Sequence, residues 1–92
     1  MRVRMRYQGR VQGVGFRMTA LSIATRHAVS GWVRNEADGS VLLQVEGGSA
    51  EVEGYLSDLA ASMGRNIVQA TRTDLGSWEI DEAGLGGFEI RH

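Results

Sequence analysis

Residues 2–24 read RVRMRYQGRVQGVGFRMTALSIA, and three patterns follow one another in this stretch. Over residues 3–7 apolar side chains alternate with arginines, which predicts a half-buried strand. Three glycines then fall within residues 9–15, which predicts a loop. From Phe16 to about His27 the apolar residues recur at helical spacing. The chain is therefore predicted to begin with a strand, a glycine-rich loop and a helix.

The rest of the chain continues with strands and one more helix. Asp38-Gly39 is a strong hairpin signal, and strand-like runs flank it on both sides. An amphipathic stretch predicts a second helix, with Ser49 as its N-cap and Gly64 as its stop. The strands predicted after the first one cover residues 31–35, 41–45, 67–74 and 88–90.

The predicted order is strand, helix, strand, strand, helix, strand, with a possible short strand at the end. This βαββαβ order predicts an α+β, ferredoxin-like split βαβ sandwich, in which two helices cover one face of an antiparallel sheet. Its first two strands are parallel, so the glycine loop and Asn35 are expected at the same edge of the sheet. A length of 92 residues predicts a single domain over residues 1–92.

The composition excludes several classes of protein. The chain is 42% hydrophobic and 23% charged, as is typical of a soluble globule. It has no cysteine, so it has no disulfide framework and no thiolate nucleophile. His27 and His92 are too far apart for a local metal motif, and we expect no metal and no cofactor. We find no signal peptide and no apolar run long enough for a membrane span, so we expect a cytoplasmic monomer that does not bind membranes.

The charge is unevenly distributed along the chain. The first 35 residues contain seven arginines and no acidic residue, and every basic residue of the chain is arginine. The guanidinium fork suits carboxylate and phosphate groups, so this third of the chain could form an anion site. For Arg2, Arg4 and Arg6 we favour a simpler interpretation, the solvated face of a strand. The pI of about 6.1 argues against nucleic acid as a partner.

The loop before the first helix has the features of a site for a phosphate-like oxyanion. Glycines let successive backbone N–H groups converge, and the positive end of the following helix points to the same place. Arg17, in the first turn, can add a bidentate contact. The alternative is a tight glycine turn with Arg17 as an ordinary surface residue. The dinucleotide fingerprint GxGxxG fails because Met18 stands at its last position.

Two segments resemble the signature motifs of the acylphosphatase family. The first is GRVQGVGFR over residues 9–17, and the second is GWVRN over residues 31–35, followed by DGSV over residues 38–41. The resemblance extends over essentially the whole chain in length and element order. Acylphosphatases hydrolyse the carboxyl–phosphate bond of acyl phosphates without metal or cofactor. The resemblance therefore implies a small-molecule acyl phosphate as substrate, with inorganic phosphate or sulfate as competing anions.

The resemblance also implies roles for particular residues. Arg17 would bind the phosphoryl group and Asn35 would hold the attacking water. The rest of the phosphoryl site would be the backbone N–H groups of Gln12, Gly13, Val14, Gly15 and Phe16. An alternative from another class is a noncatalytic module that keeps this loop to bind phosphate or another anion. Asn35 favours the hydrolase, because a simple anion binder has no use for an amide that holds water.

Overall fold

The computed structural model describes residues 1–76 and 87–92, and it confirms the predicted order of elements. The predicted strand at the end of the chain is present. Part of the glycine-rich stretch before it, and Trp78, lie outside the described residues. The elements are β1 (Arg2–Gly9), α1 (Phe16–Ala24), β2 (Val29–Asn35), β3 (Val41–Gly47), α2 (Ser49–Met63), the 3-10 helix η1 (Gly64–Asn66), β4 (Ile67–Asp74) and β5 (Phe88–Arg91).

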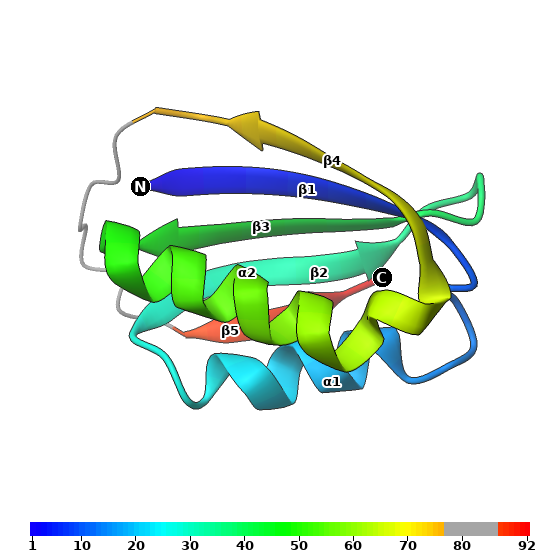
Figure 1. The fold of residues 1–92 in the computed structure, drawn as a ribbon, viewed down its shortest axis with the longest axis horizontal. Coiled ribbons are helices and arrows are strands. Elements are labelled where there is room, and N and C mark those ends of the chain that lie inside the picture. The colour runs from blue at the N-terminus through cyan, green and yellow to red at the C-terminus, as the bar shows by residue number, and fades with distance from the viewer. Residues whose placement is uncertain (77–86) are drawn as a thin grey trace.

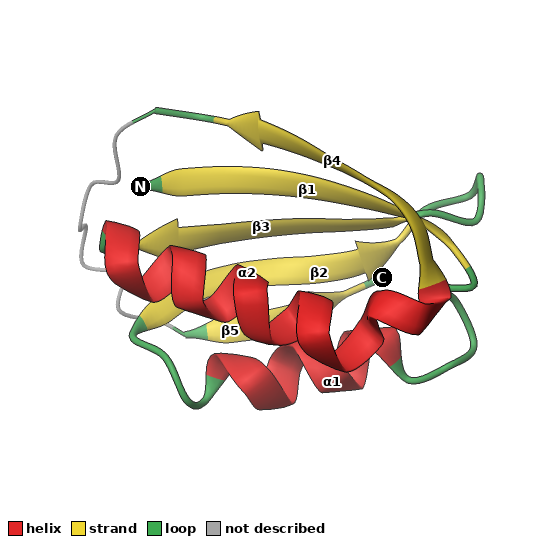
Figure 2. Ribbon diagram, viewed as in Figure 1, coloured by secondary structure: helices red, strands yellow, loops and turns green. Residues whose placement is uncertain are grey.

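The strands form one five-stranded sheet in the order β4-β1-β3-β2-β5, and both helices lie on the same face of it (Figures 1 and 2). Neighbouring strands from β4 to β2 are antiparallel, as predicted. β5 is different, because it pairs in parallel with β2, and Val33 lies opposite Ile90. The sheet is therefore mixed and not wholly antiparallel, because the chain adds its last strand at the outer edge of β2.

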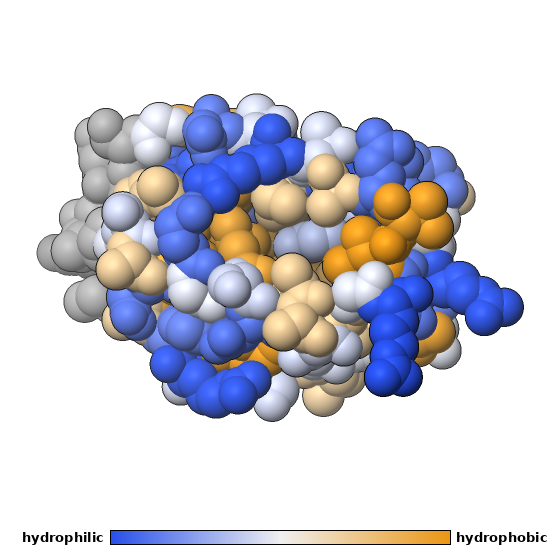
Figure 3. Space-filling model, in the orientation of Figure 1, coloured by the Kyte–Doolittle hydropathy of each residue, from blue (hydrophilic) through white to orange (hydrophobic). Residues whose placement is uncertain are grey.

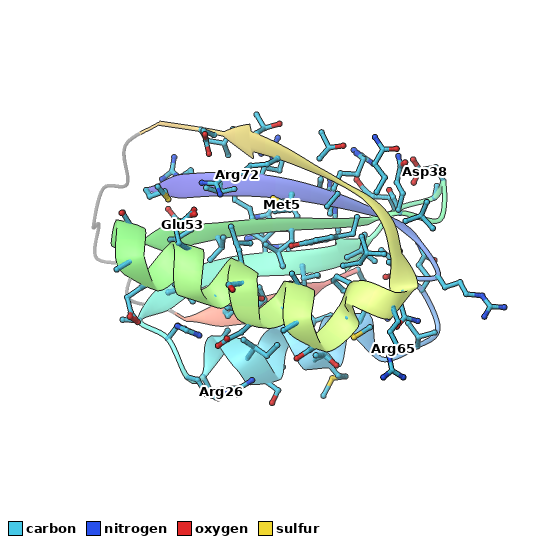
Figure 4. All side chains as sticks on the ribbon, viewed as in Figure 1. Met5, Arg26, Asp38, Glu53, Arg65 and Arg72 are labelled. Carbon is cyan, nitrogen blue, oxygen red and sulfur yellow. The ribbon has the colours of Figure 1, made fainter. Side chains whose placement is uncertain are left out.

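The core lies between the sheet and the two helices. The alternation in β1 buries Val3, Met5 (labelled in Figure 4) and Tyr7 in the core between the sheet and the helices. Tyr55 of α2 is fully buried, and its hydroxyl donates a hydrogen bond of 2.9 Å to the carbonyl of Ala20 in α1. A buried hydroxyl needs such a partner, so this bond ties the two helices together inside the apolar layer.

The other face of β1 carries the arginines predicted to be a solvated strand face. Each of them reaches across to β3 or to the hairpin that precedes it. Arg2 pairs with Glu46 at 2.9 Å, and Arg4 donates to Gln44 at 2.8 Å. Arg6 donates to the Ser40 hydroxyl at 2.8 Å. These arginines are therefore used in cross-strand contacts, away from the helices.

Both helices differ from the prediction at their ends. α1 stops at Ala24, three residues before the predicted end, and turns lead from there into β2. Gly48 is the N-cap of α2 and Ser49 is already helical, with no side-chain cap. Gly64 does not end the helix in a left-handed conformation, since its φ of −56° continues into η1. Within the described residues, no helix combines the length and the apolar character that crossing a membrane requires.

The topology brings the two predicted motifs together. β1 and β2 are each antiparallel to β3 and hence parallel to one another. Their carboxyl ends lie at the same end of the molecule, at the right in Figure 1. The loop of residues 10–15 leaves the end of β1, and Asn35 is the last residue of β2. The start of α1 lies at this end as well.

Candidate active site

The loop between β1 and α1 contains two glycines in the left-handed region. Gly13 has a φ of 76° and Gly15 a φ of 80°, whereas no described non-glycine residue has a positive φ. Val14, between them, therefore has a negative φ, so the backbone alternates between the left-handed and right-handed regions. A chain that alternates in hand in this way turns successive N–H groups toward one side, which forms a concave site for anions. A side chain at either glycine position would meet no atom within 4 Å, so the glycines are needed for their conformation and not for space.

The N-terminus of α1 points its own N–H groups to the same place. Its first internal hydrogen bond runs from the Thr19 N–H to the Gly15 carbonyl, at 2.9 Å. The N–H groups of residues 16–18 consequently have no partner within the helix. The helix has no side-chain cap and no acidic residue in its first turn. Its positive end is therefore left for an anion from outside the chain.

The Gln12 side chain holds this loop in position. Its amide Nε2 donates to the carbonyl oxygens of Glu36 and Ser40, at 2.8 and 2.9 Å. These two residues lie at the two sides of the β2–β3 hairpin, where the Glu36 N–H also bonds the Ser40 carbonyl. Gln12 was expected to contribute a backbone N–H, but the structure also gives its side chain a role in joining the loop to the hairpin.

The hairpin itself is held by Asp38. The Asp38 carboxylate accepts hydrogen bonds from the hydroxyl and the backbone N–H of Ser40, the latter at 2.9 Å. These bonds hold the pKa of Asp38 below its ordinary value, and Arg6, 3.6 Å away, adds a smaller effect in the same direction. The hairpin to which Gln12 donates its hydrogen bonds is thus also stabilised by hydrogen bonds of its own.

A cavity of about 110 Å³ lies between the loop, the start of α1 and the end of β2. It is large enough for a small oxyanion, since one water molecule needs only about 10–15 Å³ of such space. Five of the predicted residues line it, whereas Gln12 and Val14 do not. The sequence did not identify two further lining residues, Val11 and Met18. The complete lining is Val11, Gly13, Gly15, Phe16, Arg17, Met18 and Asn35.

Arg17 lies half-buried in the wall of this cavity. Within residues 1–76 and 87–92 its guanidinium forms no ion pair with a carboxylate. Its Nη1 instead lies 3.3 Å from Nδ1 of His92. Because a guanidinium can only donate, the imidazole accepts this bond. The sequence offered no signal for the contact, since the two residues are 75 positions apart and meet only because β5 pairs with β2.

Asn35 forms another part of the wall. Its Oδ1 is buried and has no hydrogen-bond partner in the described part of the chain. A buried acceptor without a donor costs about 1–3 kcal/mol, and such groups are uncommon in folded proteins. Rotation of the amide exchanges its donor and its acceptor, so Asn35 can offer either to a polar molecule in the cavity. The Oδ1 of Asn35 is therefore free to accept a hydrogen bond from such a molecule, as far as the described residues show.

Comparison with known proteins agrees with this geometry. The family model described as acylphosphatase matches residues 3–90. The chain belongs to the acylphosphatase family. An acylphosphatase from Thermococcus kodakarensis is 40% identical over 89 residues, which are 97% of this chain and 93% of the relative. An acylphosphatase from Rhizobium etli is 42% identical over 77 residues, 84% of this chain and 82% of the relative.

A solved acylphosphatase structure has the same fold. The crystal structure of acylphosphatase from Bacillus subtilis superposes with a TM-score of 0.81 at 26% identity, covering 99% of this chain and 98% of that one. The resemblance inferred from the two sequence motifs is thereby confirmed at the level of family and fold. The acylphosphatase fold brings the two motifs to one cavity, at the carboxyl ends of β1 and β2.

Proposed function

We propose that this chain hydrolyses acyl phosphates to a carboxylate and inorganic phosphate. The observation that carries the proposal is that Arg17 and Asn35 line one cavity at the open N-terminus of α1. Within the described residues, an arginine without a carboxylate partner, the free N–H groups at the start of α1 and the unpaired Oδ1 of Asn35 thus belong to the same small region. Membership of the acylphosphatase family supports the same reaction.

The phosphoryl group binds to the loop and to Arg17. The N–H groups at the start of α1 and in the loop donate to its oxygens, and the Arg17 fork adds charge-assisted bonds. Transfer of a phosphoryl group proceeds through a loose transition state in which charge spreads over the non-bridging oxygens. Fixed donors around those oxygens therefore stabilise the transition state, and Arg17 contributes the only full charge among the described residues that line the cavity.

Asn35 positions the water that attacks phosphorus. The amide can accept from one hydrogen of the water and donate to its oxygen, which fixes the direction of attack. The water oxygen bonds to phosphorus while the bond from phosphorus to the acyl oxygen breaks. The carboxylate leaves with the electron pair, and a proton of the water passes to a phosphoryl oxygen. The conjugate acid of a carboxylate has a pKa of about 4, so the leaving group needs no general acid.

The direct test is hydrolysis of benzoyl phosphate by the purified chain in the presence of a chelator. We expect hydrolysis well above the spontaneous rate and competitive inhibition by phosphate and sulfate. Glycerol phosphate should not be hydrolysed, because its alkoxide leaving group needs a proton donor. An absence of benzoyl phosphate hydrolysis, together with normal phosphate binding, would overturn the proposal and favour the noncatalytic anion-binding module.

A further inference from the structure

Met18 is an apolar side chain that the phosphoryl site does not need. It lines the cavity, and yet 62% of its surface is exposed. Exposed large apolar residues are few in the described part of the chain: besides Met18 they are Val14, 44% exposed, and Val68, 85% exposed. Two of these three therefore lie within four positions of each other, at the loop and at the start of α1. Single exposed apolar residues are common, but this pair adjoins a proposed active site.

The geometry of the reaction places the acyl group on the open side of the cavity. In phosphoryl transfer the attacking and leaving oxygens lie roughly in line, on opposite sides of phosphorus. The Oδ1 of Asn35, on the nucleophile side, is buried. The leaving acyl group must therefore point away from Asn35 and toward solvent. Met18 is the cavity-lining side chain that is most exposed to that solvent.

Two exposed arginines near this end of the molecule, unlike Arg17, do not line the cavity. Arg65, labelled in Figure 4, and Arg10 are both exposed here, and strongly hydrophilic side chains project from this end in Figure 3. Neither arginine borders the cavity, so neither is placed to pair with the part of the substrate next to phosphorus. Met18, by contrast, lines the cavity and is exposed, and its unbranched thioether side chain can adapt its shape to aromatic and aliphatic groups.

We propose that Met18 determines substrate specificity by packing against the acyl group, so that the enzyme prefers acyl phosphates with an aromatic or a bulky aliphatic acyl group. This inference rests on the hydrolase function proposed above. Met18 touches the part of the substrate that leaves and not the phosphoryl group. Its contribution therefore grows with the apolar surface of the acyl group and is smallest for acetyl phosphate.

The test compares kcat/KM for benzoyl phosphate and acetyl phosphate in the wild type and in Met18→Gln. Glutamine keeps the length and the helix propensity of methionine but not its apolar surface. We expect Met18→Gln to lower kcat/KM at least about fivefold for benzoyl phosphate, with less than a twofold effect on acetyl phosphate and on phosphate inhibition. Met18→Leu should restore most of the loss. Val68→Thr, which changes an exposed apolar residue on β4, is the matched control. It should leave kcat/KM unchanged for both substrates.

Three outcomes would overturn the specificity role. In the first, Met18→Gln leaves kcat/KM unchanged for both substrates. In the second, it lowers kcat/KM for both substrates by the same factor. A wild type that prefers succinyl phosphate, with its second carboxylate, to benzoyl phosphate would also contradict it. Failure of the underlying function looks different, because the wild type would then hydrolyse none of these acyl phosphates.

Discussion

Arg17 differs from half of the ten arginines of this chain in what surrounds its guanidinium. In the part of the chain that the structure describes, five arginines form ion pairs with carboxylates, and most of these pairs lie on the sheet and its edges. Within residues 1–76 and 87–92, Arg17 has no carboxylate partner; its guanidinium contacts the ring nitrogen Nδ1 of His92 and lines the cavity. The paired arginines are Arg2, Arg6, Arg34, Arg72 and Arg91.

Replacing Arg17 by Gln should remove most of the activity and leave the fold intact. The change deletes the full positive charge of the cavity, and loss of a single transition-state donor costs about 10²–10³-fold in rate. We expect kcat/KM for benzoyl phosphate to fall at least about a hundredfold with little change in melting temperature. Arg26→Gln is the matched control, because Arg26 is exposed and lies at the other end of α1 (Figure 4). An active Arg17→Gln variant would contradict the role of Arg17.

The pairing of β2 with β3 requires their two backbones to approach each other closely at Gly31. This glycine has a φ of 151°, and a Cβ there would lie 1.9 Å from the backbone oxygen of Gln44. Backbone atoms of a paired strand cannot move aside as a flexible side chain can, so the two strands would have to separate. Asn35 follows in the same strand, and distortion of the pairing would therefore reach the site.

Gly31→Ala should destabilise the protein strongly, and Gly39→Ala provides the comparison. Gly39 also has a positive φ, 91°, but a Cβ there would meet nothing within 4 Å. Both variants carry backbone strain of about 1–2 kcal/mol, and only Gly31→Ala adds the clash. We expect thermal unfolding to place the melting temperature of Gly31→Ala at least about 10 °C below that of Gly39→Ala. Equal melting temperatures would mean that the strands tolerate a side chain at this point.

The elements and the core of the site were predictable because they depend on local patterns. Alternation and helical spacing give the order of strands and helices, and the split βαβ topology then brings Arg17 and Asn35 to one edge. The role of the Gln12 side chain was not predictable, since its acceptors are backbone carbonyls that leave no mark in the sequence. The contact of His92 with Arg17 was missed for a related reason, because it depends on the parallel pairing of the four-residue strand β5.

The parts that hold the molecule together are separate from the cavity that we propose binds anions. The helices and the inner face of the sheet form the core, the outer face of β1 carries cross-strand contacts, and the cavity lies at one end. A ligand that binds only the folded state stabilises it by mass action. Phosphate binding in the cavity should therefore be visible in the stability of the whole protein.

Inorganic phosphate should raise the melting temperature of the wild type and not that of Arg17→Gln. At ten times its dissociation constant, a ligand stabilises the fold by about 1.4 kcal/mol. For a domain of this size that corresponds to a rise of about 5–10 °C. The measurement is thermal unfolding in phosphate against sodium chloride at equal ionic strength. An equal rise in both proteins would show that phosphate acts elsewhere on the surface.

The central claim is that one cavity holds the phosphoryl group through Arg17 and the attacking water through Asn35, and Asn35→Ala tests it most directly. The measurement is kcat for benzoyl phosphate and the inhibition constant for phosphate on the same variant. We expect kcat to fall at least about a hundredfold while the inhibition constant changes less than about twofold, because Asn35 acts on the nucleophile and not on the bound anion. The melting temperature should hardly fall, since Oδ1 makes no hydrogen bond within the described chain. A folded Asn35→Ala variant with near-normal kcat would contradict the claim.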